Sequence, residues 1–140
     1  MLFRSARAAL PELIQTRGNI VNTASVSGLG GDWAMAFYNA SKGAVVNLTR
    51  AMALDHGRQG VRVNAVCPSL TITPMSAGLQ QNQSLLDRFN QRIALGRPCE
   101  PREVAAAIAF LASDDASFIT GVNLPVDGGL GASNGQPDMG

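Results

Sequence analysis

The stretch NIVNTAS, residues 19–25, is short, apolar and rich in β-branched side chains, and it decides the fold class. Gly18 stands immediately before it, and a loop rich in serine and glycine follows it. An apolar run of this length between such boundaries is typical of a strand that is buried in a parallel sheet. We therefore predict a buried strand over these residues.

The residues on either side of this strand have helical spacing. Before it, apolar side chains between residues 2 and 14 recur on one face, although Pro11 should kink or divide that helix. After it, a helix from about Asn39 to His56 carries apolar or small residues nearly all round. Such a helix must be buried on more than one side, either within the domain or against a second subunit.

The rest of the chain continues this alternation. GVRVNAVCP (60–68) predicts a second strand, and PREVAAAIAFLAS (101–113) predicts a helix with proline in its first turn. ITGVNLPVDGG (119–129) predicts a last strand, in which Pro125 favours an edge position. The polar segment from roughly Ser69 to Arg97 is long enough to form a mobile flap over a site.

Helices that alternate with strands predict an α/β fold with a parallel sheet and right-handed crossovers. Three strands make up half of a doubly wound, Rossmann-like domain, which pairs two βαβαβ halves. No repeat or linker divides the chain, so we predict one partial domain over residues 1–130. Residues 131–140 are rich in glycine, serine and asparagine and are predicted to form a flexible tail.

Composition and charge narrow the possible partners. The chain has 140 residues, of which 46% are hydrophobic and 15% are charged, and its formal net charge is +1. This balance is typical of a soluble globular domain and argues against nucleic acid or an anionic membrane as the main partner. No apolar stretch reaches the roughly 18 residues that a membrane span needs. Arg4, Arg7 and Pro11 interrupt any secretory signal, so we expect a cytoplasmic protein.

Several side chains that often carry chemistry receive structural interpretations. Cys67 and Cys99 have no CxxC spacing and no nearby ligand, so no metal is expected and both are predicted to be buried or half-buried thiols. His56 precedes Gly57, where it favours a helix C-terminus rather than catalysis. Asp127 is predicted to be a turn residue, with a subunit contact as the alternative.

The only tyrosine and the only lysine, Tyr38 and Lys42, stand four positions apart. On a helix, both side chains leave the same face, with about 5–6 Å between their Cβ atoms. A tyrosine phenol has an unperturbed pKa near 10, and a nearby ammonium lowers this pKa because it stabilises the phenolate. The pair therefore predicts that Tyr38 acts as an acid or base. Lys42 is also a compact donor that can hydrogen-bond a ligand hydroxyl.

A third polar group is predicted at the end of the first strand. Ser25 lies thirteen residues before the tyrosine, where strand ends of open α/β sheets gather ligand-binding groups. Its hydroxyl could donate to a substrate carbonyl or a developing alkoxide. Thr23 and Ser27 are neighbours that could be confused with it, and all three hydroxyls could instead bond the backbone in a serine-rich turn. Trp33 and Phe37 either line the substrate pocket or pack the loop.

Four motifs in order resemble a known family. GNIVNTASVSG, YNASK, GVRVNAVCPSLTITPM and SFITGVNLPVDGG are similar to the C-terminal half of a short-chain dehydrogenase/reductase of the compact, classical type. The resemblance extends from about Met1 to Gly129. It implies an NAD(P)-dependent oxidoreductase that interconverts a secondary alcohol and a ketone by hydride transfer.

The resemblance also implies roles for individual residues. Ser25 matches the serine that orients the substrate oxygen, Tyr38 the general acid/base, and Lys42 the lysine that lowers the tyrosine pKa and holds the nicotinamide ribose. Backbone and hydroxyl groups after the second predicted strand would bond the carboxamide of NAD or NADP. The cofactor-binding residues that the resemblance implies are Tyr38, Lys42, Pro68, Ser69, Thr71 and Thr73.

The chain departs from the family pattern in two ways. Pro68-Ser69 stands where members have Pro-Gly, which puts a Cβ and a hydroxyl at a position of close approach. The glycine-rich TGxxxGxG turn of the family and an asparagine of its catalytic group have no match in this sequence. The glycine clusters GLGG (28–31) and GGLGASNG (128–135) do not fit the pattern of a phosphate-binding turn. We therefore expect this chain alone to bind the dinucleotide weakly or not at all, and the choice between NAD and NADP stays open.

Partners follow from the same resemblance. Members associate as dimers or tetramers through helices that correspond to residues 2–17 and 39–56, and through the last strand. A homodimer or homotetramer that acts on a small-molecule alcohol or ketone is therefore expected. The alternative is a non-catalytic, truncated oligomerisation module of the same fold. A related epimerase or dehydratase shares the Tyr/Lys pair, but the compact C-terminus after VDGG disfavours it.

Overall fold

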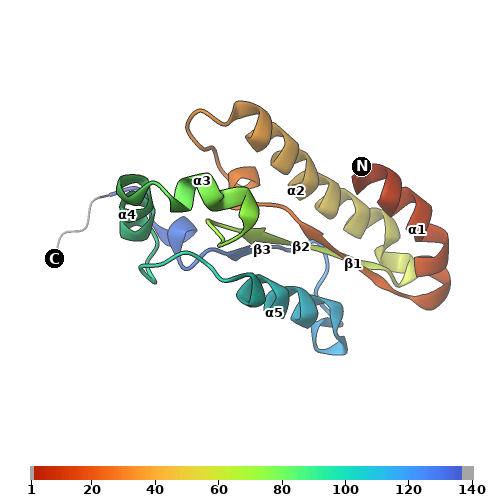
Figure 1. Cartoon of the computed structure of the whole chain (residues 1–140). Helices are drawn as coiled ribbons and strands as arrows, with labels where there is room; N and C mark the ends of the chain where they lie inside the picture. Colours follow the sequence, from red (N-terminus) through yellow and green to blue (C-terminus); the bar gives the residue numbers. More distant parts are fainter. Residues whose placement is uncertain (1, 137–140) are drawn as a thin grey trace.

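Three parallel strands form the centre of the molecule, in the order β1–β2–β3 (Figure 1). The computed structural model describes residues 2–136. The strands are β1 (Asn19–Thr23), β2 (Arg62–Pro68) and β3 (Asn123–Val126). β1 pairs with β2 from Asn19↔Arg62 to Thr23↔Val66, and β2 pairs with β3 from Ala65↔Asn123 to Pro68↔Val126. The predicted α/β fold with a parallel sheet is confirmed, and Pro125 lies on an edge strand of the described sheet, as predicted.

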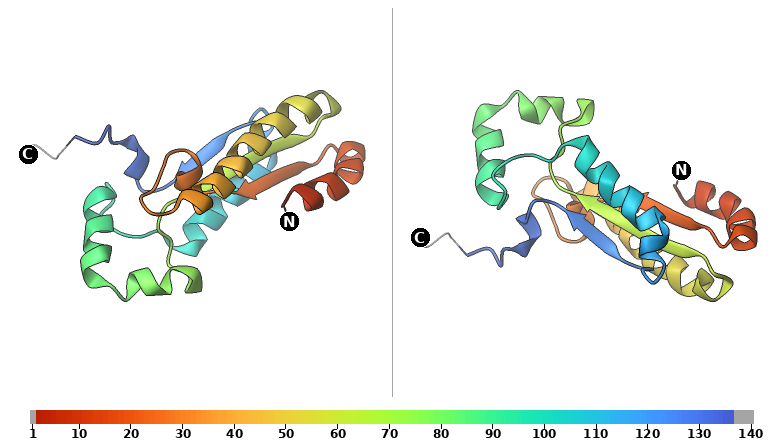
Figure 2. Two further views of the ribbon diagram at one scale, coloured as in Figure 1. Left: turned by 90° about the horizontal axis from the view of Figure 1, so that it is seen from above. Right: turned by 90° about the horizontal axis from the view of Figure 1, so that it is seen from below.

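Helices cover both faces of the sheet. Helices α1 (Leu2–Thr16) and α2 (Ala36–His56) lie on one face, and α5 (Pro101–Ala112) lies on the other (Figures 1 and 2). Side chains alternate along β2, so Val63 packs on the α1–α2 side while Val66 packs against α5. Both valines are fully buried. This two-faced burial is why the strands are apolar runs rather than alternating ones.

The first helix differs from its prediction. Pro11 lies inside α1, which continues unbroken from Leu2 to Thr16. Proline removes one backbone hydrogen bond and crowds the preceding turn. Leu10, Leu13 and Ile14 nevertheless pack against the core around Met52, and we attribute the continuous helix to this apolar contact. Pro11 therefore does not divide the helix, and the alternative that it kinks the helix stays a prediction.

The second helix begins earlier than predicted. α2 starts at Ala36 instead of about Asn39, so Tyr38 lies in its first turn and Lys42 in its second. It ends at His56, as predicted, and the His56 ring nitrogen Nδ1 lies 2.7 Å from the Gln59 side-chain oxygen. The early start places both chemically important side chains on one rigid element.

The segment from Ser69 to Arg97 contains helices of its own. It folds into α3 (Ala77–Gln80) and α4 (Gln83–Arg92), which lie beyond the end of the sheet where the strands finish (Figure 2). Its predicted mobility stays a prediction. The predicted tail begins within a short 3-10 turn, Leu130–Ala132, and its residues 137–140 lie outside the described residues.

Buried polar side chains lock the helices to the strands. Asn22 donates to the Thr49 hydroxyl at 2.9 Å and so ties β1 to α2. Arg62 donates to the carbonyls of Leu111 at 2.7 Å and Ser113 at 3.1 Å, which are orphan acceptors at the C-terminal end of α5. Between residues 2 and 136, no helix is long and apolar enough to cross a membrane.

Candidate active site

The candidate site lies where β1 and β2 end. Ser25 is extended and caps the 3-10 turn Val26–Gly28, and its hydroxyl oxygen accepts from the Ser27 backbone N–H at 3.2 Å. The same oxygen lies 3.5 Å from the carbonyl of Pro68, the last residue of β2. The side chain of Ser25 is buried between two strand ends, where a parallel sheet gathers its binding groups.

A glycine lets the serine turn approach α2 closely. A Cβ on Gly28 would lie 2.6 Å from the Lys42 carbonyl oxygen and 2.9 Å from a Val46 methyl group. The nearer of these atoms is helix backbone, which cannot move aside without disturbing α2. Glycine at position 28 therefore allows the turn that begins at Ser25 to lie directly against the helix that carries Tyr38 and Lys42.

Tyr38 and Lys42 share one face of α2, as their spacing predicts. The Lys42 ammonium lies 5.7 Å from the centre of the Tyr38 ring, which is within the range of a cation–π interaction. It also donates to the Thr23 carbonyl at 3.1 Å. Thr23 is the last residue of β1 and stands two positions before Ser25. The ammonium is thus held between the phenol ring and the end of the strand that leads to Ser25.

The predicted cofactor residues lie on the stretch that leaves β2. Ser69 donates its hydroxyl proton to the Asp127 carbonyl at 3.3 Å and so joins the ends of β2 and β3. Thr71 donates to the Ser69 carbonyl at 3.0 Å, and the Thr73 backbone N–H donates to Ser76 at 3.1 Å. The structure therefore brings Pro68 close to Ser25, while among the described residues no hydrogen bond joins Thr71 or Thr73 to Tyr38 or Lys42.

Asp32 is a site residue that sequence reasoning missed. Its carboxylate accepts a hydrogen bond from the Ser27 hydroxyl, and its backbone carbonyl accepts from the Asn39 side chain at 3.0 Å. The position lies in an irregular loop, where no periodicity marks a contact, and the sequence offered no signal for it. The alternative prediction was a serine-rich turn whose hydroxyls bond only the backbone. Ser25 agrees with it in part, because its hydroxyl oxygen accepts from a backbone N–H, whereas the Ser27 hydroxyl donates to the Asp32 carboxylate.

A cavity of about 540 Å³ lies beside this loop. Val26, Leu29 and Asp32 line it on one side, and Pro125 and Leu130 on the other. Asp127 also lines the cavity, but its carboxylate accepts from the N–H groups of Gly129 and Gly131. Apolar walls with the Asp32 carboxylate suit a small, uncharged molecule that can donate a hydrogen bond.

Trp33 and Phe37 do not pack the loop, and their place in the substrate pocket stays a prediction. Their side chains are 98% and 94% exposed, so they pack against nothing in the loop, and they are absent from the residues that line the two described cavities. The loop turns at Ala34, which has a positive φ of 60° and lies between Trp33 in the loop and Phe37 in the first turn of α2. Both side chains are left available for contacts outside the described chain.

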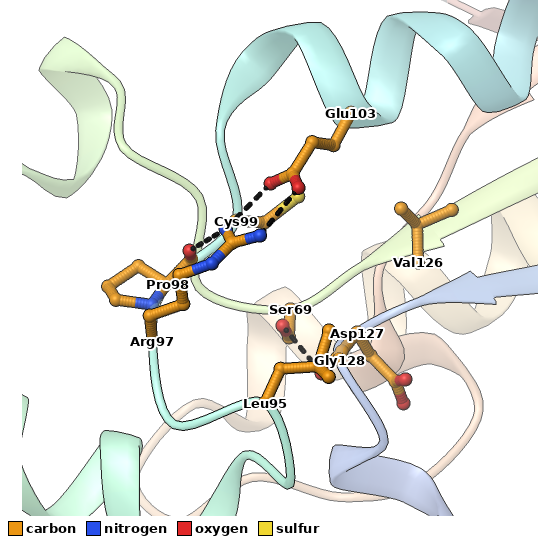
Figure 3. A pocket seen from close by; sticks show the side chains of 9 residues that line it. All are labelled: Ser69, Leu95, Arg97, Pro98, Cys99, Glu103, Val126, Asp127 and Gly128. Atoms are coloured by element: carbon orange, nitrogen blue, oxygen red, sulfur yellow. Dashed lines mark hydrogen bonds and ion pairs between the residues drawn. The ribbon is translucent and has the colours of Figure 1, made fainter.

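A second cavity, of about 100 Å³, lies on the other side of β3's end (Figure 3). Arg97 crosses it and binds the Glu103 carboxylate through two N–H groups at 2.9 and 2.7 Å. The Arg97 guanidinium and the Glu100 backbone N–H lower the pKa of Glu103 to about 2. The carboxylate of Asp127 accepts from the N–H groups of Gly129 and Gly131, as predicted for a turn residue. These charges are already paired, so this cavity is structural.

Both cysteines have the predicted character of small packed thiols. Cys67 is fully buried beneath the strand ends, and burial raises the pKa of its thiol. Cys99 is half-buried, and burial followed by the nearby Glu103 raises its thiol pKa as well. Thiols with raised pKa values are poor nucleophiles. The thiols are therefore not candidates for the reacting groups of this site.

Comparison with known proteins identifies the family. A family model described as Enoyl-(Acyl carrier protein) reductase matches residues 2–131. Meso-2,3-butanediol dehydrogenase from Serratia marcescens is 68% identical over 134 residues, which are 96% of this chain and 53% of that protein. The 7alpha-hydroxysteroid dehydrogenase of Bacteroides fragilis is 45% identical over 120 residues, covering 86% of this chain and 46% of that protein. The chain belongs to the short-chain dehydrogenase/reductase family.

Solved structures agree on the fold. A gluconate 5-dehydrogenase from Burkholderia cenocepacia, in complex with NADP and tartrate, has a TM-score of 0.90 at 32% identity and matches 94% of this chain and 52% of that one. A 4-hydroxyisoleucine dehydrogenase complexed with NADH has a TM-score of 0.89 at 35% identity, with 94% and 55% covered. The chain spans about half the length of the curated relatives it matches.

Proposed function

We propose that this chain supplies the proton-transfer half of an NAD(P)-dependent oxidoreductase that interconverts a secondary alcohol and a ketone. One observation carries the proposal: the Lys42 ammonium lies between the Tyr38 ring and the end of the strand that leads to Ser25. A phenol can act as a general acid or base, and a cation held beside its ring is placed to act on it electrostatically. The dehydrogenase names of the relatives support the same class of reaction.

Each of the three side chains has one role in this proposal. Tyr38 gives a proton to the substrate oxygen in reduction and takes it back in oxidation. Lys42 favours the phenolate and so lowers the free energy of that transfer. Ser25 hydrogen-bonds the same oxygen and fixes its position relative to the phenol.

The donor set fits the nicotinamide end of a dinucleotide. An ammonium carries three N–H donors, and the Thr23 carbonyl takes one, which leaves two for the ribose hydroxyls. The Ser69 hydroxyl is turned to the Asp127 carbonyl, so the change from glycine is accommodated between the strands. The residues that would hold this end are Tyr38, Lys42, Pro68, Ser69, Thr71 and Thr73. Bound NAD or NADP supplies the hydride chemistry.

We propose a small, uncharged secondary alcohol, such as a vicinal diol, as the substrate class. The relative that is 68% identical is named for a butanediol. The cavity beside the serine turn has apolar walls and the Asp32 carboxylate, which accepts hydrogen bonds and repels anions. Comparison of kcat/KM for a neutral diol and for a hydroxy acid of similar size tests this choice, and a preference for the acid would refute it.

We also propose that this chain alone lacks the surface that binds the adenine and pyrophosphate. It spans about half the length of its relatives, and its glycine clusters do not form the expected phosphate turn. Isothermal titration of the chain with NADH and NADPH should show no micromolar binding. Dehydrogenase assays with and without a complementing half from a relative should show activity only in the mixture. Micromolar binding by the chain alone would contradict this part of the proposal.

A non-catalytic assembly module is the second candidate. Phe37 and Leu54 on the outer side of α2 are 94% and 84% exposed, which favours a surface that meets another subunit. The family resemblance implies association as a dimer or tetramer through this helix. Sedimentation velocity gives the oligomeric state, and the complementation assay separates the two functions. A stable oligomer that never gains dehydrogenase activity would favour the module.

A further inference from the structure

A chain of hydrogen bonds joins an exposed carboxylate to the buried Ser25. Asp32 accepts from the Ser27 hydroxyl, and the Ser27 oxygen lies 3.1 Å from the Ser25 hydroxyl oxygen. Ser25 and Ser27 are only 7% and 5% exposed, whereas Asp32 lies at the surface and on the wall of the larger cavity. Two buried hydroxyls are thus connected to the outside through one side chain.

The chemistry of the groups sets the direction of these bonds. A carboxylate only accepts hydrogen bonds, so the Ser27 hydroxyl proton points to Asp32. The Ser27 oxygen then receives the Ser25 hydroxyl proton, while the Ser25 oxygen accepts from the Ser27 backbone N–H. Besides the Pro68 carbonyl at 3.5 Å, Ser25 is consequently held by two contacts to Ser27, and Asp32 sets the orientation of the Ser27 side chain.

Asp32 also holds the helix that carries the tyrosine. Its backbone carbonyl accepts from the Asn39 side chain at 3.0 Å, and Asn39 directly follows Tyr38 in α2. The loop between Ser25 and Tyr38 is therefore fixed at both ends through a single residue. Loops with few buried apolar contacts move readily, and such a two-sided link reduces that freedom at the point where the reacting groups meet.

We propose that Asp32 is a positioning residue that, through Ser27, holds the Ser25 hydroxyl in one rotamer at the end of β1. The importance of that rotamer for turnover rests on the function proposed above. The presence of a single Ser25 rotamer does not depend on that function, because it is a property of the chain without substrate. Asp32 touches Ser27 and Asn39, so it acts on the substrate oxygen through Ser25.

The direct test is nuclear magnetic resonance on the chain of 140 residues. Scalar couplings across χ1 report whether Ser25 occupies one rotamer or averages among several. We expect one rotamer in the wild type and in Asp32→Asn, which keeps an acceptor oxygen, and averaging in Asp32→Ala and Ser27→Ala. Asp87→Ala is the matched control, because it removes another exposed carboxylate hydrogen bond, that of Gln83. A single Ser25 rotamer in both alanine variants overturns the proposal.

Turnover measurements separate this proposal from the proposed function. In the assembly that shows dehydrogenase activity, we expect Asp32→Ala to lower kcat about 10-fold and Asp32→Asn to stay within about 3-fold of the wild type, because misplaced groups react slowly. If Ser25→Ala leaves turnover unchanged, the role of Ser25 in the proposed function fails while the rotamer result stands. If Asp32→Ala does not fold, Ser27→Ala decides the matter, because it breaks the same link from the other side.

Discussion

Two regions at the same end of the sheet are held in opposite ways. At the corner of β1 and α2, polar contacts join residues far apart in sequence, such as Lys42 to Thr23 and Asn22 to Thr49. In the segment from Ser69 to Arg97, Ser76 and Gln80 bond groups no more than seven residues away. Within that segment only Leu70 and Ile93 are buried.

The two kinds of contact suit two different tasks, proton transfer and recognition of the substrate. Long-range contacts to a buried sheet fix the angles and distances among reacting groups, which proton transfer requires. Local contacts let a segment keep its helices while it shifts relative to the sheet, because few buried contacts oppose the movement. The corner of β1 and α2 thus supplies the proton-transfer groups of the proposed reaction, and we expect the segment to adapt to the substrate.

The largest expected effect is loss of the phenol at the corner. In the active assembly, Tyr38→Phe should lower kcat about 10²- to 10⁴-fold, because the general acid/base is removed. Circular dichroism and the melting temperature should stay close to the wild type, since the ring and its contact with the Lys42 ammonium remain. Ketone reduction followed through NADH or NADPH absorbance measures the change. Retention of more than a tenth of the activity would exclude the proposed role of Tyr38.

The next effect tests how closely the serine turn approaches α2. Gly28→Ala places a Cβ 2.6 Å from the Lys42 carbonyl oxygen, and backbone atoms cannot yield cheaply. We expect the free energy of unfolding to fall by about 1–3 kcal/mol, as for other overpacked positions. Gly30→Ala is the control, because nothing lies within 4 Å of a Cβ there. Urea denaturation of both variants gives the comparison, and equal stabilities would mean that the turn does not pack on the helix.

Loss of a buried hydrogen bond at the corner of β1 and α2 should lower the free energy of unfolding slightly less than Gly28→Ala. Thr49 is fully buried, and Thr49→Val keeps its shape but leaves the Asn22 amide without its acceptor. The expected loss in the free energy of unfolding is about 1–2 kcal/mol, because a buried donor is left without its acceptor. Thr16→Val is the matched control, because the Thr16 hydroxyl is exposed and bonds only the Glu12 carbonyl. Thermal melts should show a clear shift for the first variant and almost none for the second.

The smallest effect concerns the exposed ion pair that ends the adaptable segment. The Glu103 pKa falls from 4.5 to about 2 in the folded chain, chiefly through Arg97. A lowered pKa stabilises the folded state above the unfolded pKa, and this stability disappears as the pH falls through about 2.

The wild type should therefore lose slightly more stability than Glu103→Gln between pH 5 and pH 2, and 1 M salt should reduce the difference. Melting temperatures of the two proteins across that interval provide the measurement. Parallel curves would show that the Arg97–Glu103 pair does not persist in solution.

Much of the fold followed from local pattern. The apolar run at residues 19–25 and the alternation after it predicted a parallel sheet, and Pro125 predicted an edge strand, because burial and missing donors are local properties. Pro11 misled the same reasoning, because packing against Met52 is not visible in the neighbouring sequence. The role of Asp32 could not be predicted for a similar reason, because contacts made by an irregular loop leave no periodic pattern in the sequence.

The sequence by itself determined which groups this chain can bring to a reaction: one phenol, one ammonium four residues later, and a serine at a strand end. Helical and strand periodicity act over a few residues, so such spacing can be read directly. Only the tertiary structure decided that Lys42 reaches the Thr23 carbonyl, that Ser69 joins two strands, and that Asp32 holds Ser27. These contacts join segments that meet only when the chain packs, and their partners depend on where the loops come to lie.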